Sequence, residues 1–223
     1  MKVIKQSEVN QSLMSKFPEE DIEKASKTCK ARAEQIQMFM RIACRQDCYN
    51  CPHQPDAGFI SPSGTIGADT MFVFLKPDDE DAFVHAMGFG PSSRFLTMML
   101  DKFKTRPQDA YITTLAKCNG TKATEAAKIC LSHFFLDELH RVQPKRVILF
   151  GEETSEIVRE AIGLDHEPFD DIEGVTFPHV YQGHRLDILS LKSPQDVLTK
   201  NGTLFKSMRK DIWQGLKSVM VAG

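Results

Sequence analysis

Apolar residues recur along the chain at two different spacings. Between residues 19 and 45 they return every third or fourth position, which indicates one apolar face of a long helix. Further on, short apolar runs alternate with helical patterns. The runs lie at 71–75, 111–115, 146–150 and 186–191, and the helical patterns lie at 92–103, 123–142, 153–162 and 204–220. Strands separated by helices predict a mostly parallel sheet covered on both faces, with functional sites beyond the carboxyl ends of the strands.

Composition narrows the class of protein without indicating a substrate. The 223 residues carry 28 basic and 30 acidic side chains, and the net charge of -2 excludes a histone-like protein held on nucleic acid by bulk charge. No apolar run approaches the roughly 18 residues that span a bilayer, and the N-terminal residues lack the apolar core of a signal peptide. We therefore expect a cytoplasmic protein with no membrane association.

The six cysteines are unusual for a reducing compartment, where clustered thiols more often bind metals or catalyse than form disulfides. Cys48 and Cys51 form a C-x-x-C pair that can hold one corner of a metal site. Cys118 follows the second predicted strand, and Cys130 lies in the next helical pattern. Four thiolates bind either zinc or a 4Fe-4S cluster, and the spacing does not decide between them. Cys29 lies on the apolar helical stripe, which indicates core packing.

An alternative assignment begins at Cys44. The series Cys44-x-x-x-Cys48-x-x-Cys51 has the spacing of the cluster motif of radical S-adenosylmethionine enzymes. That motif follows a strand and has an aromatic residue before its last cysteine, whereas here a helical pattern precedes it and Asn50 takes the aromatic position. The alternative also leaves the two later cysteines unexplained, so we rank it lowest.

A set of short segments follows in a fixed order after residue 47. They are the Cys48–Cys51 pair, Pro77 beyond the first strand, Gly88-Phe89-Gly90, 111–118, Cys130, 144–151 and a final helix with Trp213. In this order and spacing, the chain from about residue 48 onward resembles the iron-sulfur uracil-DNA glycosylases of thermophiles and archaea, within the uracil-DNA glycosylase superfamily.

This resemblance implies a fold, a cofactor and a partner. The fold would be a three-layer α/β/α sandwich around a mostly parallel sheet over residues 48–223, preceded by a helical extension over 1–47. The cofactor would be a structural 4Fe-4S cluster, and the substrate a base flipped out of DNA. The ligands of the cluster would be Cys48, Cys51, Cys118 and Cys130.

The segments that carry catalysis in this family are mostly replaced here. Where the family has Gly-Glu-Ala-Pro-Gly, residues 74–78 read Phe-Leu-Lys-Pro-Asp, so Leu75 takes the position of the Glu. The family's Phe that stacks on uracil falls near Gly88, and its Asn that reads the uracil edge is Thr114. The His-Pro-Ser loop becomes Ser193-Pro194-Gln195. Two interpretations follow: a catalytically silent DNA-binding or complex subunit, or a site rebuilt for another base.

Acidic residues directly after Pro77 favour the rebuilt site. Cleavage of a glycosidic bond develops positive oxocarbenium character on the sugar, and a nearby carboxylate stabilises this charge or places a water. Asp78 and Asp79 lead the acidic run at 78–81 and are the expected catalytic residues, although such a run is also typical of a solvated turn. Lys76 is a lower-ranked amine nucleophile, because a cation would oppose the developing charge.

The replacements also enlarge the expected base pocket, whose predicted lining is Leu75, Pro77, Gly88, Phe89 and Thr114. A glycine in place of the family's Phe removes a large ring from the wall at the C5 carbon of the base. The pocket should then admit a bulkier pyrimidine, such as a hydroxymethylated or sugar-bearing one. Bases of that kind are typical of viral DNA, which leads to the hypothesis of a role against modified phage genomes.

Two segments offer contacts for DNA phosphates. Ser92 and Ser93 open a predicted helix, where free N–H groups and hydroxyls suit a phosphate, although plain helix capping explains them equally well. Lys192 and Ser193 follow the last predicted strand, at the edge of the sheet where the site is expected.

A third segment, the predicted loop at 197–202, offers an apolar wedge at Leu198 beside Lys200, as in enzymes that flip bases. His184 is a further candidate for an acid or a phosphate contact. We expect a monomer that binds DNA, and a protein partner on the N-terminal helix stays open.

Overall fold

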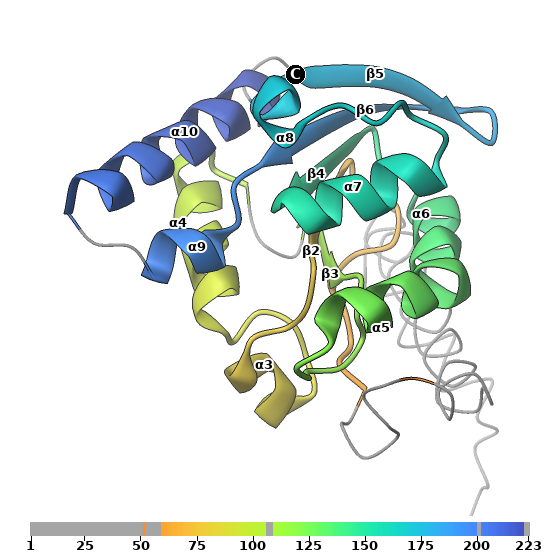
Figure 1. Ribbon diagram of the computed structural model, residues 1–223, viewed down its shortest axis with the longest axis horizontal. Coiled ribbons are helices and arrows are strands. Elements are labelled where there is room, and N and C mark those ends of the chain that lie inside the picture. Colours follow the sequence, from red (N-terminus) through yellow and green to blue (C-terminus); the bar gives the residue numbers. More distant parts are fainter. Residues whose placement is uncertain (1–50, 52–58, 106–108, 200–201, 221–223) are drawn as a thin grey trace, which may run out of the picture.

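The computed structural model describes residues 51, 59–105, 109–199 and 202–220, and its centre is a six-stranded sheet (Figure 1). The strand order is β1-β3-β2-β4-β6-β5, and the four inner strands β3, β2, β4 and β6 run parallel to one another. The strands are β1 Ser63–Gly64, β2 Thr70–Phe74, β3 Tyr111–Thr114, β4 Arg146–Phe150, β5 Thr176–Tyr181 and β6 His184–Leu191. The four predicted strands and their mostly parallel arrangement are therefore confirmed.

The two edge strands, β1 and β5, were not predicted. Each pairs antiparallel with its neighbour. β1 has only two residues, which is too short to show any period. β5 alternates between exposed and half-buried residues and contains Pro178, and proline is tolerated on an edge strand because one side of that strand needs no hydrogen bonds.

Helices cover both faces of the sheet, which confirms the three-layer α/β/α sandwich (Figure 1). Successive strand residues point to opposite faces. Phe72 and Phe74 of β2 pack with the helices on one face, and Met71 and Val73 pack with those on the other. Helices α4 Pro91–Lys102, α9 Pro194–Thr199 and α10 Gly202–Met220 lie on the first face, and α5 Ala123–Cys130, α6 Leu136–Val142 and α7 Glu152–Ala161 lie on the second.

The structure departs from the predicted helices in three places. The predicted helix at 123–142 contains a π-helical turn, Leu131–Phe135, between α5 and α6. The acidic run after Pro77 is not a loop, because it begins helix α3 Asp79–Val84. A four-residue helix, α8 Phe169–Ile172, was too short to predict. The predicted extension over 1–47 lies outside the described residues, and within them no helix is long and apolar enough to cross a membrane.

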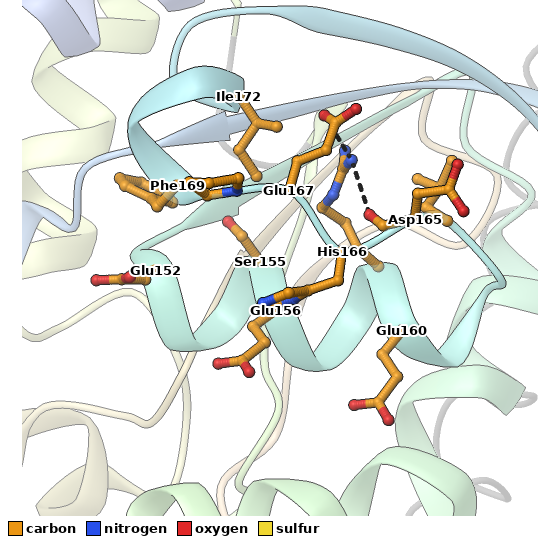
Figure 2. A pocket seen from close by; sticks show the side chains of 12 residues that line it. Glu152, Ser155, Glu156, Glu160, Asp165, His166, Glu167, Phe169 and Ile172 are labelled. Atoms are coloured by element: carbon orange, nitrogen blue, oxygen red, sulfur yellow. Dashed lines mark hydrogen bonds and ion pairs between the residues drawn. The ribbon is translucent and has the colours of Figure 1, made fainter.

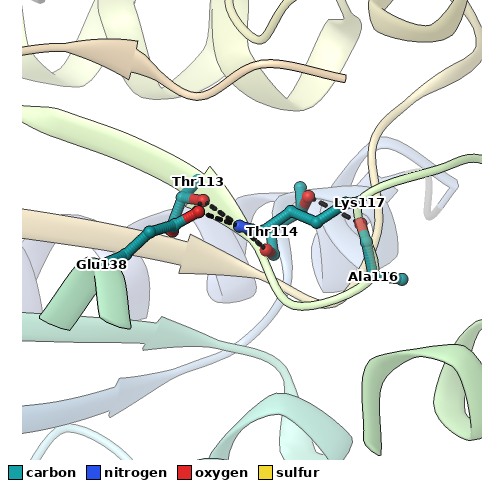
Figure 3. A network of polar contacts seen from close by, with 5 residues as sticks. All are labelled: Thr113, Thr114, Ala116, Lys117 and Glu138. Atoms are coloured by element: carbon teal, nitrogen blue, oxygen red, sulfur yellow. Dashed lines mark hydrogen bonds and ion pairs between the residues drawn. The ribbon is translucent and has the colours of Figure 1, made fainter. Parts of the chain in front are cut away.

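A buried ion pair fixes the end of β3 to helix α6 (Figure 3). Lys117 is 2% exposed and Glu138 is fully buried, and Lys117 Nζ lies 2.6 Å from Glu138 Oε1. Lys117 also donates to Thr113 Oγ1 and to the Thr114 carbonyl, both at 2.6 Å, and the Thr113 hydroxyl donates to Glu138 Oε2 at 2.7 Å. The network holds the segment immediately before Cys118 against the second helical layer.

Burial raises the pKa of Glu138, and the charge and hydrogen bond of Lys117 oppose this rise. A carboxylate and an ammonium removed from water are each costly alone, and each makes the other tolerable. The pair is therefore a coupled element of the fold.

We predict that Lys117→Met lowers the free energy of unfolding by about 3–5 kcal/mol, because it leaves Glu138 buried without a cation. The pKa of Glu138 should rise further in this variant. The folded state then holds a proton that the unfolded chain releases above its ordinary pKa of 4.5, so the variant should lose stability as pH rises from about that value. Denaturant unfolding across pH 4.5 to 8 measures both effects.

The double variant Lys117→Met/Glu138→Gln is the control, since it removes both charges. It should recover most of the lost stability and its pH dependence should be flatter. A single variant that loses less than about 1 kcal/mol, with no change in pH dependence, would contradict the coupling.

Candidate functional site

The carboxyl ends of the parallel strands bring three loops together at one edge of the sheet. They follow β2, β3 and β6. The first two continue side by side beyond their strands, because Leu115 N–H donates to the Phe74 carbonyl at 2.8 Å and Ala116 N–H donates to the Leu75 carbonyl at 2.9 Å. The predicted catalytic residues lie in the first of these loops, at the carboxyl ends of the strands, where parallel sheets commonly carry their sites.

Asp78 is the residue at which these segments meet. Its Oδ2 accepts a hydrogen bond from Ser92 N–H at 2.8 Å, and its Oδ1 accepts from the Ser92 hydroxyl at 3.1 Å and from Gln195 Nε2 at 2.7 Å. A Cβ atom on Gly90 would lie 2.5 Å from Asp78 Oδ2, so only glycine permits this close approach. Asp78 thus ties the loop after β2 to the start of α4 and to α9.

Asp79 has a different environment. Its side chain is exposed, and its Oδ1 accepts a hydrogen bond from Asn119 Nδ2, which comes from the loop after β3. Its Oδ2 has no hydrogen bond to any residue that the structure describes. Asp79 therefore retains a carboxylate oxygen that can bind a water or stabilise a cation. Sequence reasoning missed Asn119, whose only signal was its place next to Cys118.

Asp81 belongs to the scaffold. It is fully buried, and its Oδ1 accepts the backbone N–H groups of Gly88, Phe89 and Gly90 at 3.0, 2.8 and 2.9 Å. Interpreting the acidic run as a solvated turn is therefore wrong for this residue. Its carboxylate shapes the turn that precedes α4 and leaves Asp78, Asp79 and exposed Glu80 as the acidic groups near the strand ends.

The residues predicted to line the base pocket differ in accessibility. Pro77 is buried and Leu75 is half-buried in the core on the α5–α7 face. Gly88 is exposed with a φ of +115°, and a Cβ there would have only Ser63 Oγ within 4.0 Å. Phe89 is 46% exposed. Among the residues that the structure describes, the space around residue 88 is therefore open.

Thr114 is 1% exposed, and its hydroxyl donates to the Ala116 carbonyl at 2.7 Å. Its hydroxyl hydrogen is thus already used by the backbone. Lys76, the lower-ranked nucleophile, is half-buried in the loop directly before Pro77.

The structure corrects the expected geometry of the first phosphate contacts. Ser92 and Ser93 do lie in the first turn of α4, but they are 3% and 0% exposed, and the Ser92 hydroxyl binds Asp78. Neither hydroxyl is presented to solvent. Arg94, in the same turn, is exposed.

Lys192 and Ser193 follow β6 as predicted, but Lys192 already has acidic partners. Its Nζ lies 2.9 Å from Glu173 Oε2 and 3.5 Å from Asp211 Oδ2. The hydrogen bond to Glu173 is the largest cause that raises the pKa of Lys192. A phosphate would have to compete with both carboxylates. Ser193 accepts a hydrogen bond from Gln195 N–H at 3.2 Å and lies beside the Asp78 contact.

The predicted wedge is part of a helix. Leu198 is 43% exposed on α9, whereas its neighbour Val197 is fully buried in the core. Lys200 lies outside the described residues.

His184 does not belong to the site. It is the first residue of β6, which runs parallel to β4, so it lies at the opposite end of the sheet from Leu191 and the strand ends that carry Asp78. Its Nε2 lies 2.9 Å from the Pro144 carbonyl oxygen. The contact indicates a structural role at that end of the sheet.

Phe59 and Ile60 contact the segments that carry two of the predicted metal ligands, Cys118 and Cys130. Ile60 N–H donates to the Lys117 carbonyl at 2.8 Å, and the ring of Phe59 contacts the ring of Phe134 edge-on at 6.3 Å. These contacts join the segment after Cys51 to the residue before Cys118 and to the turn after Cys130.

Cys51 and Cys118 are half-buried and Cys130 is buried. Among the described residues, no three Cys, His, Asp or Glu side chains form a group that could hold a metal, and Cys48 lies outside them. The contacts of Phe59 and Ile60 bring the Cys118 and Cys130 segments to one part of the chain.

A cavity of about 420 Å³ lies along α7 and α8 (Figure 2). Its floor includes Arg159, whose Nη2 lies 3.4 Å from both the Asp165 carbonyl and Glu167 Oε2. Carboxylates surround it, from Glu152, Glu156, Glu160, Asp165 and Glu167. Such a lining repels phosphates, and the cavity contains no predicted site residue, so we do not assign it to DNA.

Comparison with known proteins agrees with the arrangement of strands and loops. Residues 62–217 match the model of the Uracil DNA glycosylase superfamily. A type-4 uracil-DNA glycosylase from Archaeoglobus fulgidus is 20% identical over 156 residues, which cover 68% of this chain and 78% of that protein. The family match spans the strand-end loops, α4 and most of α10. The chain therefore belongs to the uracil DNA glycosylase superfamily and is a DNA glycosylase by class.

Proposed function

We propose that the protein excises a 5-substituted pyrimidine from DNA, with Asp79 as the catalytic carboxylate and Asp78 as the residue that positions it. The observation that carries the proposal is the meeting of the loops after β2, β3 and β6 at two adjacent aspartates, one held by three hydrogen bonds and the other exposed. A base would enter this edge after it is flipped out of the duplex.

The chemistry requires one carboxylate with a free oxygen. The bond between C1′ of the sugar and the base nitrogen breaks, the base leaves with the electron pair, and a water oxygen forms the new bond to C1′. The Asp79 carboxylate stabilises the positive sugar and accepts the proton of the water, while the leaving base takes a proton from solvent. Asn119 orients Asp79 through its hydrogen bond to Oδ1.

Gly88 supports the preference for a bulky base. Its positive φ and the open space beside it mean that neither a side chain nor a neighbouring ring occupies this position within the described residues. Phe89 and Leu75 would form the rest of the wall. A hydroxymethyl or sugar group on C5 would be accommodated there, and phage DNA that carries such bases is the substrate we infer.

The cofactor that we propose is a 4Fe-4S cluster held by Cys48, Cys51, Cys118 and Cys130, with zinc as the alternative. Thiolate ligands suit either. When bound, the group would crosslink three segments and take no part in the reaction. The named type-4 relative and the contacts of Ile60 and Phe59 support this set over the radical S-adenosylmethionine alternative, which would begin at Cys44.

A silent DNA-binding subunit is the second candidate. The apolar Leu75 in the position of the family's Glu favours it, and so does the saturation of Asp78 by hydrogen bonds. This candidate differs from the enzyme in one measurable respect, because it would bind DNA without releasing a base.

We predict that Asp79→Asn lowers single-turnover base release by about 10²- to 10⁴-fold, which is the usual range for loss of a catalytic acid or base. The melting temperature of Asp79→Asn should equal that of the matched control Glu80→Gln, which removes one negative charge from the neighbouring exposed residue. Asp78→Asn should lower both activity and melting temperature, because it breaks the contacts to Ser92 and Gln195. Full activity in Asp79→Asn and in Asp78→Asn would refute the carboxylate mechanism.

The substrate preference can be measured with duplexes that carry uracil, 5-hydroxymethyluracil, 5-hydroxymethylcytosine or its glucosylated form. We expect alkali-labile abasic sites in the duplexes with 5-substituted bases and slower release of uracil. A second reaction with borohydride tests Lys76, since an amine nucleophile would be trapped covalently on the DNA. Release of uracil alone would contradict the size argument, and binding without release of any base would establish the silent subunit.

The cluster assignment predicts a brown protein that contains iron and sulfide. Cys118→Ser should abolish the visible absorption of thiolate bound to iron and lower thermal stability, because one ligand is lost. Cys44→Ser is the control and should retain both. A colourless wild-type protein that contains one zinc ion would show that the metal is zinc and not iron. Loss of colour in Cys44→Ser but not in Cys118→Ser would show that the N-terminal cysteines are the ligands.

A further inference from the structure

Four cations and the single tryptophan of the chain meet in a shallow groove between α4 and α10. The groove has a volume of about 280 Å³. Its lining is Met99, Lys102, Lys206, Arg209, Lys210 and Trp213, which we call the basic groove. The four cations are exposed and the tryptophan is half-buried.

The sequence of α10 explains why these side chains share one face. Lys206, Arg209, Lys210 and Trp213 follow the spacing i, i+3, i+4, i+7, which places them on one side of a helix. The adjacent face carries Ile212 and Leu216, which are buried against the sheet. Lys206 and Lys210 lie one turn apart and repel each other, which disfavours the helix unless an anion lies between them.

Trp213 fixes the contribution of α4 to the groove. Its ring stacks on Phe103 with centroids 4.5 Å apart and planes 13° apart. Lys102 Nζ lies 5.4 Å from the centroid of the Trp213 ring, so a cation–π contact holds the ammonium of α4 toward α10. Within the described ranges, no carboxylate forms an ion pair with any of the four cations. Positive charge is thus concentrated here on a chain with a net charge of -2.

The position of the basic groove relates it to the strand-end site. Helix α9 packs against both α4 and α10 (Figure 1). The same short helix carries Gln195, which binds Asp78, and exposed Leu198. Helix α4 connects the two places, because its first turn carries Ser92, which binds Asp78, and its last residue, Lys102, lines the groove. The helix rises about 15 Å from Ser92 to Lys102, which is less than the roughly 34 Å of one turn of duplex DNA, so one duplex can reach both.

We infer that the basic groove binds the phosphate backbone of the DNA that flanks the nucleotide in the site. The inference rests on the proposed function, because it assigns a path to the same DNA. A polyanion with regularly spaced charges fits cations that are distributed over two turns of a helix and a neighbouring helix. Binding through phosphates carries no base information, so this contact would add affinity for every DNA sequence.

The test is the salt dependence of binding to a 24-base-pair duplex without modified bases, measured by fluorescence anisotropy with the full chain. The variant Lys206→Gln/Arg209→Gln/Lys210→Gln should lower the slope of log K against log salt by about 2–3, at close to 0.9 for each lost phosphate contact. Its Kd at moderate salt should rise by about tenfold or more. The matched control is Lys128→Gln/Lys145→Gln/Arg185→Gln, which removes three exposed cations that lie outside α4 and α10 and should change the slope by less than about 1.

Four further outcomes separate the possible failures. Equal losses in the groove and control variants would mean that bulk charge is responsible and would overturn the groove. A groove variant that binds DNA as the wild type does would assign the cations to another partner, such as an acidic protein. The charge-preserving variant Lys206→Arg/Lys210→Arg should retain the wild-type slope, and a melting temperature of the triple variant equal to that of the wild type excludes misfolding as the cause of its loss. A wild-type protein that binds no duplex would refute the proposed function itself.

Discussion

The hydrogen bonds of the Asp78 carboxylate join three parts of the chain that are far apart in sequence. Its two oxygens hold the first turn of α4 through Ser92 and the first turn of α9 through Gln195. Both helices pack on the same face of the sheet, and the loop that carries Asp78 emerges from its central strand β2. The same contacts fix the backbone next to Asp79, which is exposed, so the position of the candidate catalytic residue depends on its neighbour.

The hydrophobic pattern was sufficient to predict the central strands and their mostly parallel order, and with them the end of the sheet at which the candidate residues gather. Parallel pairing brings the carboxyl ends of the inner strands to one edge, so Asp78 and Gln195 meet there although they are 117 positions apart in the chain. His184 was predicted as a site residue because it is polar and close to a predicted strand. It is the first residue of β6 and so lies at the amino end of that strand, away from Asp78. Direction within the sheet, which periodicity does not report, decides between the two ends.

Roles within a run of like residues could not be predicted from the sequence. Asp78, Asp79 and Asp81 are chemically identical, yet one joins segments, one is exposed, and one is buried under three backbone N–H groups. Only the path of the turn from Gly88 to Gly90 assigns these roles. The same limit applies to Ser92 and Lys192, whose partners Asp78 and Glu173 come from distant positions.

Opposite charges are separated on the surface of this nearly neutral chain. Carboxylates gather beside the strand ends, where a positive sugar would form, and cations gather between α4 and α10, where phosphates would lie. The buried pair of Lys117 and Glu138 holds the start of the loop after β3 against α6. The same loop carries Cys118 and Asn119, and Asn119 donates a hydrogen bond to Asp79. The division allows an enzyme of low net charge to bind a polyanion locally while it stabilises a cation.

The most direct test of this account is a crystal structure with a duplex that carries a 2′-fluorinated 5-hydroxymethyl pyrimidine nucleotide, whose sugar resists formation of an oxocarbenium ion. We expect the nucleotide to be flipped out of the duplex, with C1′ separated from the Asp79 carboxylate by one water and the C5 substituent beside Gly88. A nucleotide that remains stacked, or one bound away from the loops after β2 and β3, would contradict the assignment of the site.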